Sequence, residues 1–78
     1  MNKDAVRSII EATLKSGSKV PGLFDLPKVL AVRSKLESAD SVDEVLKLLE
    51  NNRSLICKAF GLADAAYTEG VKKIKTEC

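Results

Sequence analysis

The last third of the chain, residues 52–78, most constrains what this protein can fold into. Its apolar side chains recur every three or four residues, which is the period of an α-helix and not of a strand. No proline interrupts this segment, and lysines gather near its end, where positive charge suits the carbonyl terminus of a helix. The pattern predicts one long amphipathic helix, whose apolar positions are Leu55, Ile56, Ala59, Phe60, Leu62, Ala63, Ala66, Tyr67, Val71 and Ile74.

A continuous helix over this segment would be longer than the domain that contains it. About 25 helical residues span roughly 37 Å at about 1.5 Å per residue. A chain of 78 residues is expected to fold into a globule roughly 30 Å across, with a radius of gyration of about 11–12 Å. Either the helix is broken near Gly61, or a second copy of the chain buries the overhanging apolar surface, and the sequence leaves both open.

Three shorter helices are expected before the long one. Asn2 is a candidate N-cap for the first, and Ser41 with Glu44 matches the capping-box pattern at the start of the third. The expected fold class is all-α: a small four-helix domain in which three short helices pack on a longer C-terminal helix. It forms a single domain over residues 1–78, and the three short helices are expected at residues 2–16, 26–38 and 42–51.

The longest connection, residues 19–25, holds two large apolar side chains. Leu23 and Phe24 are too apolar for a fully exposed loop, so we expect this loop to lie across the core. Phe24 also precedes Asp25, the expected cap of the second helix, while Val29 occupies the fourth helical position. This spacing is that of a hydrophobic staple and predicts that Phe24 packs against Val29.

The residue types present argue against catalysis and metal binding. The chain contains no histidine, which is the commonest general base and the commonest zinc ligand. Cys57 has no base to activate it, and on a continuous helix it would lie about 31 Å from Cys78, beyond disulfide reach. No glycine-rich phosphate loop is present. We therefore expect a protein that is not an enzyme, with no catalytic residues, no cofactor and no metal site.

Charge and hydropathy exclude further classes of function. A net charge of +2 is too small to argue for nucleic acid or an anionic membrane as the partner. No apolar run approaches the roughly 20 residues of a membrane span. The N-terminal sequence lacks the hydrophobic core of a signal peptide, so we expect a cytoplasmic protein.

The sequence therefore favours a non-enzymatic helical protein that acts through protein–protein interaction. The partner is expected to be a second copy, giving a homodimer, or a helix of another protein. Arg33 projects into the apolar stripe of the second helix, and small residues on the long helix would let a neighbouring helix approach closely. The candidate partner contacts are Arg33, Phe60, Ala63, Ala66, Tyr67 and Gly70.

The alternative function is a helix-turn-helix module that binds nucleic acid. Helices over residues 42–51 and from residue 53 onward would form the motif, with Arg53 and Lys58 near the start of the recognition helix. The turn between them lacks the glycine that such turns often contain. The second helix also buries about half its circumference, and no basic stripe follows Lys58. Nucleic acid is therefore the less favoured partner.

Overall fold

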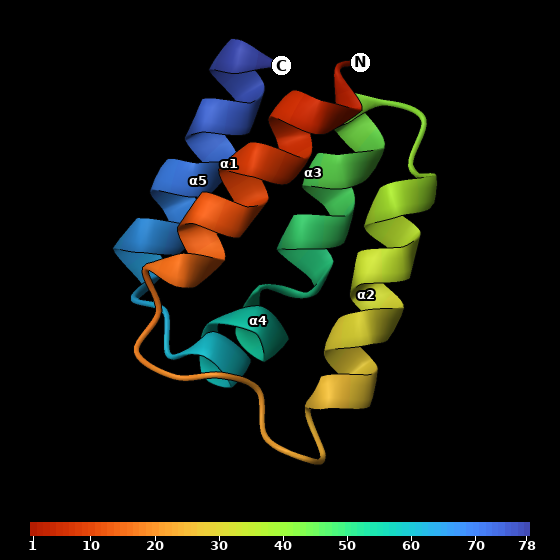
Figure 1. Cartoon of the computed structure of the whole chain (residues 1–78). Coiled ribbons are helices and arrows are strands. Elements are labelled where there is room, and N and C mark those ends of the chain that lie inside the picture. Colours follow the sequence, from red (N-terminus) through yellow and green to blue (C-terminus); the bar gives the residue numbers. More distant parts are fainter.

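Residues 53–77 form two helices, and the predicted continuous helix is wrong (Figure 1). Helix α4 (Arg53–Phe60) ends at Gly61, and α5 (Asp64–Glu77) begins three residues later. Gly61 has a φ of 62°, a left-handed conformation that glycine adopts without a side-chain clash. The alternative of a break near Gly61 is thus confirmed. The longest dimension of the molecule is 32 Å, so no helix overhangs it.

The computed structural model describes all residues from 1 to 78, as five α-helices without strands. The all-α class is confirmed, and the predicted count of four helices is wrong because of the break at Gly61. The radius of gyration is 11.5 Å, within the range expected for a chain of this length. The helices before the break are α1 (Lys3–Lys15), α2 (Leu26–Ser38) and α3 (Val42–Asn51).

The side-chain caps at Asn2 and Ser41 form as the sequence predicts, but the capping box is incomplete because Glu44 accepts from the N–H of Asp40 and not from that of Ser41. Asn2 Oδ1 accepts a hydrogen bond from the backbone N–H of Ala5 at 3.1 Å. Ser41 Oγ accepts from the N–H of Glu44 at 3.2 Å, and the Glu44 carboxylate accepts from the N–H of Asp40 at 3.3 Å. These bonds satisfy amides that a helix start leaves without partners.

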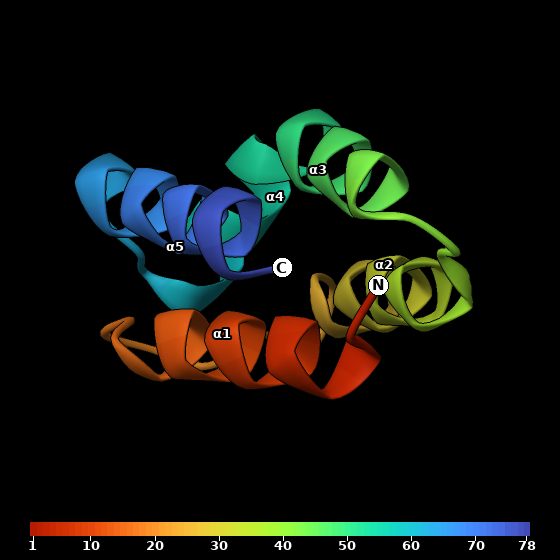
Figure 2. The same cartoon turned by 90° about the horizontal axis from the view of Figure 1, so that it is seen from above.

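The helices form two packed groups that share one core. Helix α1 packs against α5, whereas α2 packs against α3 and α4 (Figures 1 and 2). Helices α1 and α2 make little direct contact with each other, although both lie over the same core. Aliphatic side chains and one tyrosine fill that core: Val6, Val32, Ala39, Val45, Leu49, Ile56, Leu62, Tyr67 and Ile74.

Gly70 sets the close approach of α1 to α5. A side chain at this position would meet the hydroxyl and methyl groups of Thr13 on α1. The sequence predicts that a neighbouring helix packs on this small residue, and the neighbour is α1 of the same chain. Gly70 is therefore buried inside the protein.

The loop between α1 and α2 does not cover the core. Its apolar side chains lie in solvent: Val20 is 80% exposed, Leu23 83% and Phe24 86%. The prediction that this loop lies across the core is wrong. The predicted staple between Phe24 and Val29 is wrong for the same reason, since Phe24 points away from the protein.

Candidate functional site

An apolar groove runs between α1 and α2, where these two helices fail to pack on each other. It has a volume of about 410 Å³, and 16 of its 24 lining residues are hydrophobic. One face of α1 supplies Val6, Ile10 and Leu14 to the first wall. The opposite wall comes from α2, through Leu26, Val29, Leu30, Val32 and Leu36.

The other three helices close the bottom of the groove. Their contributions include Val45 and Leu49 from α3 and Ile56 from α4. One end of the groove is closed by a hydrogen bond of 3.2 Å from Lys3 Nζ to the carbonyl of Glu37. Pro21, from the loop between α1 and α2, lies at the groove as well.

Charged side chains of both signs line the groove beside its apolar walls. Arg7 and Glu11 belong to α1, and Arg33 and Glu37 belong to α2. Arg33 Nε lies 3.4 Å from Glu37 Oε1, so these two form an ion pair one turn apart. Arg7 and Glu11 form no ion pair within the chain. The groove therefore has an apolar interior, and the charged residues on its α1 side that form no ion pair are Lys3, Arg7 and Glu11.

Exposed apolar side chains continue the groove onto the outer surface. Leu26 and Leu30 line it and are 44% and 48% exposed, and the loop ahead of them carries three further exposed apolar residues. We call this continuous surface, the groove with its exposed neighbours, the apolar face. The neighbours that define it are Val20, Leu23, Phe24, Leu26 and Leu30.

The structure brings four of the six predicted contact residues to the groove. Arg33 and Phe60 line it, and Tyr67 and Gly70 form part of its floor because both are buried. Ala63 and Ala66 lie away from it. The six residues thus do not gather on one helix face.

The predicted position of Arg33 needs a correction. The sequence places it within the apolar stripe of α2, but its side chain is 68% exposed and pairs with Glu37. Only Val32 of α2 is buried, because this helix lies shallowly on the core. The guanidinium consequently stands in solvent at the edge of the groove.

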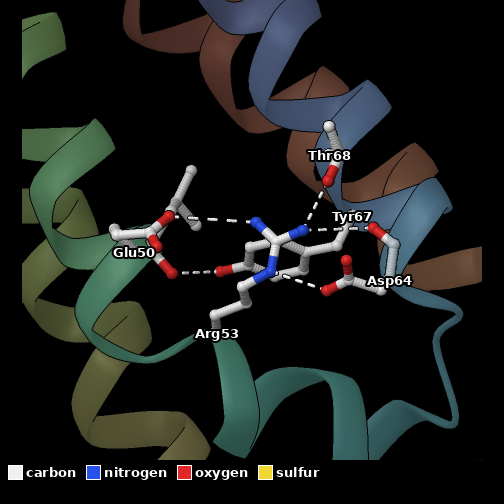
Figure 3. Close-up of polar contacts among 6 residues, drawn as sticks. Glu50, Arg53, Asp64, Tyr67 and Thr68 are labelled. Carbon is white, nitrogen blue, oxygen red and sulfur yellow. Dashed lines mark hydrogen bonds and ion pairs between the residues drawn. The ribbon is translucent and has the colours of Figure 1, made fainter.

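A separate polar cluster surrounds Arg53 at the junction of α4 and α5 (Figure 3). The guanidinium lies over the ring of Tyr67, 4.9 Å from its centroid. Arg53 Nε donates to Asp64 Oδ1 at 2.8 Å, and Nη2 donates to the Asp64 carbonyl at 3.2 Å and to the Thr68 hydroxyl. Glu50 lies 3.8 Å from Nη1. The Arg53 side chain is only 24% exposed, and its Nε and Nη2 donate to groups of the same chain.

Protonation in this cluster follows from its contacts. The hydrogen bond from Arg53, reinforced by the positive charge, lowers the pKa of Asp64 below its usual value. Burial raises the pKa of the Tyr67 hydroxyl, which donates a hydrogen bond to the carbonyl of Leu49. Burial also raises the pKa of the Cys57 thiol, which makes the thiolate less available. The cluster ties α3, α4 and α5 together.

Neither a metal-ligand cluster nor a membrane-spanning helix is found. No three histidine, cysteine, aspartate or glutamate side chains come close enough together to hold a metal ion. No helix has both the length and the hydropathy required to cross a bilayer.

Comparison with protein-family models, with curated proteins and with solved structures finds no match.

Sequence reasoning missed two features that the structure reveals. Arg53 appeared only as a candidate contact for nucleic acid, and its aspartate partner lies 11 residues away across the break at Gly61. The groove itself was not predicted, because it depends on the distance between α1 and α2. One signal for the apolar face was present in the sequence, namely the large apolar residues in a loop beside a proline and a glycine.

Proposed function

We propose that this chain is a small non-enzymatic binding module that associates with another protein through its apolar face. The observation that supports the proposal is the exposure of Val20, Leu23 and Phe24 next to a groove with apolar walls. Contiguous apolar surface of this kind is costly to leave in water, and in monomeric proteins it commonly marks an interaction site. A partner that covers the face removes that cost.

A protein partner can cover the whole apolar face in one contact. An interface of ordinary size covers about 800 Å² on each partner, which is about one sixth of the 5086 Å² that this chain exposes. The groove, the loop and the outer side of α2 are neighbours, so one partner can reach all three. Apolar contacts in the middle with charges around them are the usual composition of such interfaces.

A protein partner fits the apolar face better than a lipid or another small apolar ligand does. Such a ligand would fill the groove but leave Leu23 and Phe24 in solvent, since both lie outside it. A fatty acid would also favour a mouth of basic residues only, whereas Glu11 and Glu37 lie among the lining residues. A polypeptide can match charges of both signs.

The helix-turn-helix alternative receives less support from the contacts of Arg53. Its guanidinium is hydrogen-bonded to Asp64 and Thr68 and stacked on Tyr67. A phosphate would have to displace these groups. Helix α4, which would be the recognition helix, is 8 residues long and buries Ile56 and Ala59.

Site-specific photo-crosslinking in the native cells tests the proposal. A benzoylphenylalanine at Leu30, which is half-exposed on the groove wall, should give covalent adducts with protein chains. The same group at Ala31, exposed on the same helix but outside the groove, is the matched control. Adduct formation at position 30 well above position 31 supports the proposal. Equal, low yields at both positions would contradict it.

A further inference from the structure

We propose that the protein which covers the apolar face is a second copy of this chain. The exposed loop side chains Val20, Leu23 and Phe24 of each copy insert into the groove of the other, with Phe24 as the main apolar contact. This inference rests on the proposed function, because it names the occupant of the same face. Each copy carries both parts of the contact: an exposed apolar loop and an apolar groove.

The loop is built to project Phe24 outward. The backbone N–H groups of Asp25 and Leu26 both donate to the carbonyl of Gly22, at 3.2 and 2.9 Å, which forms a tight turn ahead of α2. Phe24 lies within this turn and is held away from the protein. A loop backbone fixed in this way loses little conformational entropy when a partner binds the ring.

The same backbone bonds keep the loop out of the groove of its own chain. At its first end, the N–H groups of Ser18 and Lys19 donate to the carbonyls of Gly61 and Phe60, both at 3.2 Å. At its second end, the turn bonds to Gly22 fix the start of α2. Bringing Phe24 into its own groove would require several of these bonds to break. A second copy can present its loop with all of them intact.

The groove has room for the side chains of the loop. Its volume of about 410 Å³ lies within the range of about 300–1,000 Å³ that is usual for sites enclosing drug-sized apolar groups. The exposed Leu26 and Leu30 stand on the wall next to it and would be covered as well. The apolar face therefore contains both parts of the contact, the groove and the exposed apolar side chains that would fill the groove of a second copy.

Charge complementarity supports this occupant. Lys19 and Asp25 flank the apolar part of the loop, and neither forms an ion pair within the chain. Arg7 and Glu11 stand on the α1 side of the groove, one helical turn apart, and are likewise unpaired. A loop from a second copy can therefore place its carboxylate at Arg7 and its ammonium at Glu11.

Reciprocal insertion makes the assembly a closed dimer. When the loop of each copy occupies the groove of the other, the contact is the same in both directions and has two-fold symmetry. Every contact then occurs twice. No loop or groove is left over to recruit a third copy.

Sedimentation equilibrium on the full chain tests the inference. We expect a monomer–dimer equilibrium with a dissociation constant of about 1–100 µM. Phe24→Asp should weaken dimerisation at least about 100-fold, since each dimer loses two buried rings. Phe24 is exposed in the single chain, so the circular dichroism spectrum of the variant should be unchanged.

The matched control and a charge exchange sharpen the test. Ala65→Asp places the same side chain at an exposed position outside the groove and should change the dissociation constant less than about two-fold. Arg7→Glu or Asp25→Arg alone should weaken the dimer about five-fold. The double variant carrying both changes should recover most of that loss, because the opposite charges face each other again.

Two outcomes would overturn the inference. One is a strictly monomeric chain up to about 1 mM, and the other is a dimer that Phe24→Asp leaves unchanged. Either result, combined with adducts from position 30 to a different protein, rejects insertion of the loop into a second copy and leaves the proposed function intact. A monomer without such adducts, or an acyl chain bound one-to-one in native mass spectrometry, rejects both.

Discussion

Gly61 is the residue that divides the C-terminal third of the chain into two helices. Its positive φ places the backbone in a region that costs other residues about 1–2 kcal/mol. A side chain there would also meet the hydroxyl of Ser18, because the loop after α1 crosses the helix end at this point. The carbonyl of Gly61 accepts the N–H of Ser18 and so joins the loop to the break.

Replacing Gly61 by alanine should therefore destabilise the fold. We expect Gly61→Ala to lower the free energy of unfolding by about 1–3 kcal/mol, from the strained φ and the contact with Ser18. Gly22→Ala is the control, since that glycine has no positive φ and nothing within 4 Å of the added carbon. It should leave stability unchanged or raise it by up to about 1 kcal/mol. Equal urea midpoints for the two variants would show that the break does not need glycine.

The pair of Arg53 and Asp64 gives the stability of the fold a defined pH dependence. The folded state lowers the pKa of Asp64 below its ordinary value of 3.8, so the unfolded chain binds the proton more tightly. The stabilisation is fully present above the unfolded pKa and is lost as the pH falls through the lower, folded pKa.

Asp64→Asn should remove this pH dependence without removing the side chain. At neutral pH the variant should melt at a lower temperature than the natural chain, because the amide carries no charge to pair with Arg53. Between about pH 5 and pH 2 the natural chain should lose more stability than the variant, so that the two melting curves converge. Melting temperatures that stay a constant interval apart across this range would contradict the assignment.

At the scale of helices, the packing of α1 on α5 depends on a glycine facing a threonine. Gly70 lets Thr13 approach so closely that an added methyl group would overlap its hydroxyl and methyl carbons. The Thr13 hydroxyl is already satisfied, since it donates to the carbonyl of Ile9 at 2.8 Å. The contact between Gly70 and Thr13 therefore depends on steric fit and not on a hydrogen bond. It positions α1, which forms one wall of the groove.

A double-mutant cycle on this contact tests the packing. Gly70→Ala should cost about 1–2 kcal/mol, as overpacking outweighs the better helix propensity of alanine. Thr13→Ala removes the overlapping atoms, so Gly70→Ala made in that background should be at least about 1 kcal/mol less costly. Urea denaturation of the four chains gives the coupling. Additive losses would mean that the two helices do not meet at this point.

Helix positions were largely predictable, because they follow from the local sequence. The bounds of α2 agree with the prediction, and those of α1 differ by one residue at each end. Apolar periodicity and the caps at Asn2 and Ser41 carry this information within a few residues. Gly61 was recognised as a break point for the same local reason, although the sequence could not decide between a break and an overhang.

The groove could not be predicted from the sequence, because it exists only where α1 and α2 do not pack against each other. Periodicity marks Leu26 and Leu30 as part of an apolar stripe, yet it does not say whether the same chain covers that stripe. The structure leaves both of them about half-exposed, since α1 packs against α5 and not against α2. The apolar character of Phe24 and its staple spacing to Val29 predict a packed side chain, whereas its exposure follows from the turn that holds it.

At the scale of the whole molecule, the physical basis for association differs from the one that the sequence suggested. The sequence argued from an overlong helix, and the break at Gly61 removes that reason. Tyr67 and Ile74 are buried within the chain, so the C-terminal helix needs no partner. The apolar face between α1 and α2, together with the loop that joins them, now motivates self-association.

The most direct test of this account is an isotope-filtered NOE experiment on a mixture of labelled and unlabelled copies at a concentration that favours the dimer. Insertion of the loop predicts NOEs between the Phe24 ring of one copy and the Ile10 and Val29 methyl groups of the other, because both residues line the groove. If the Phe24 ring gives no contact between copies while the chain sediments as a dimer, the association uses another surface. The central claim would then be wrong.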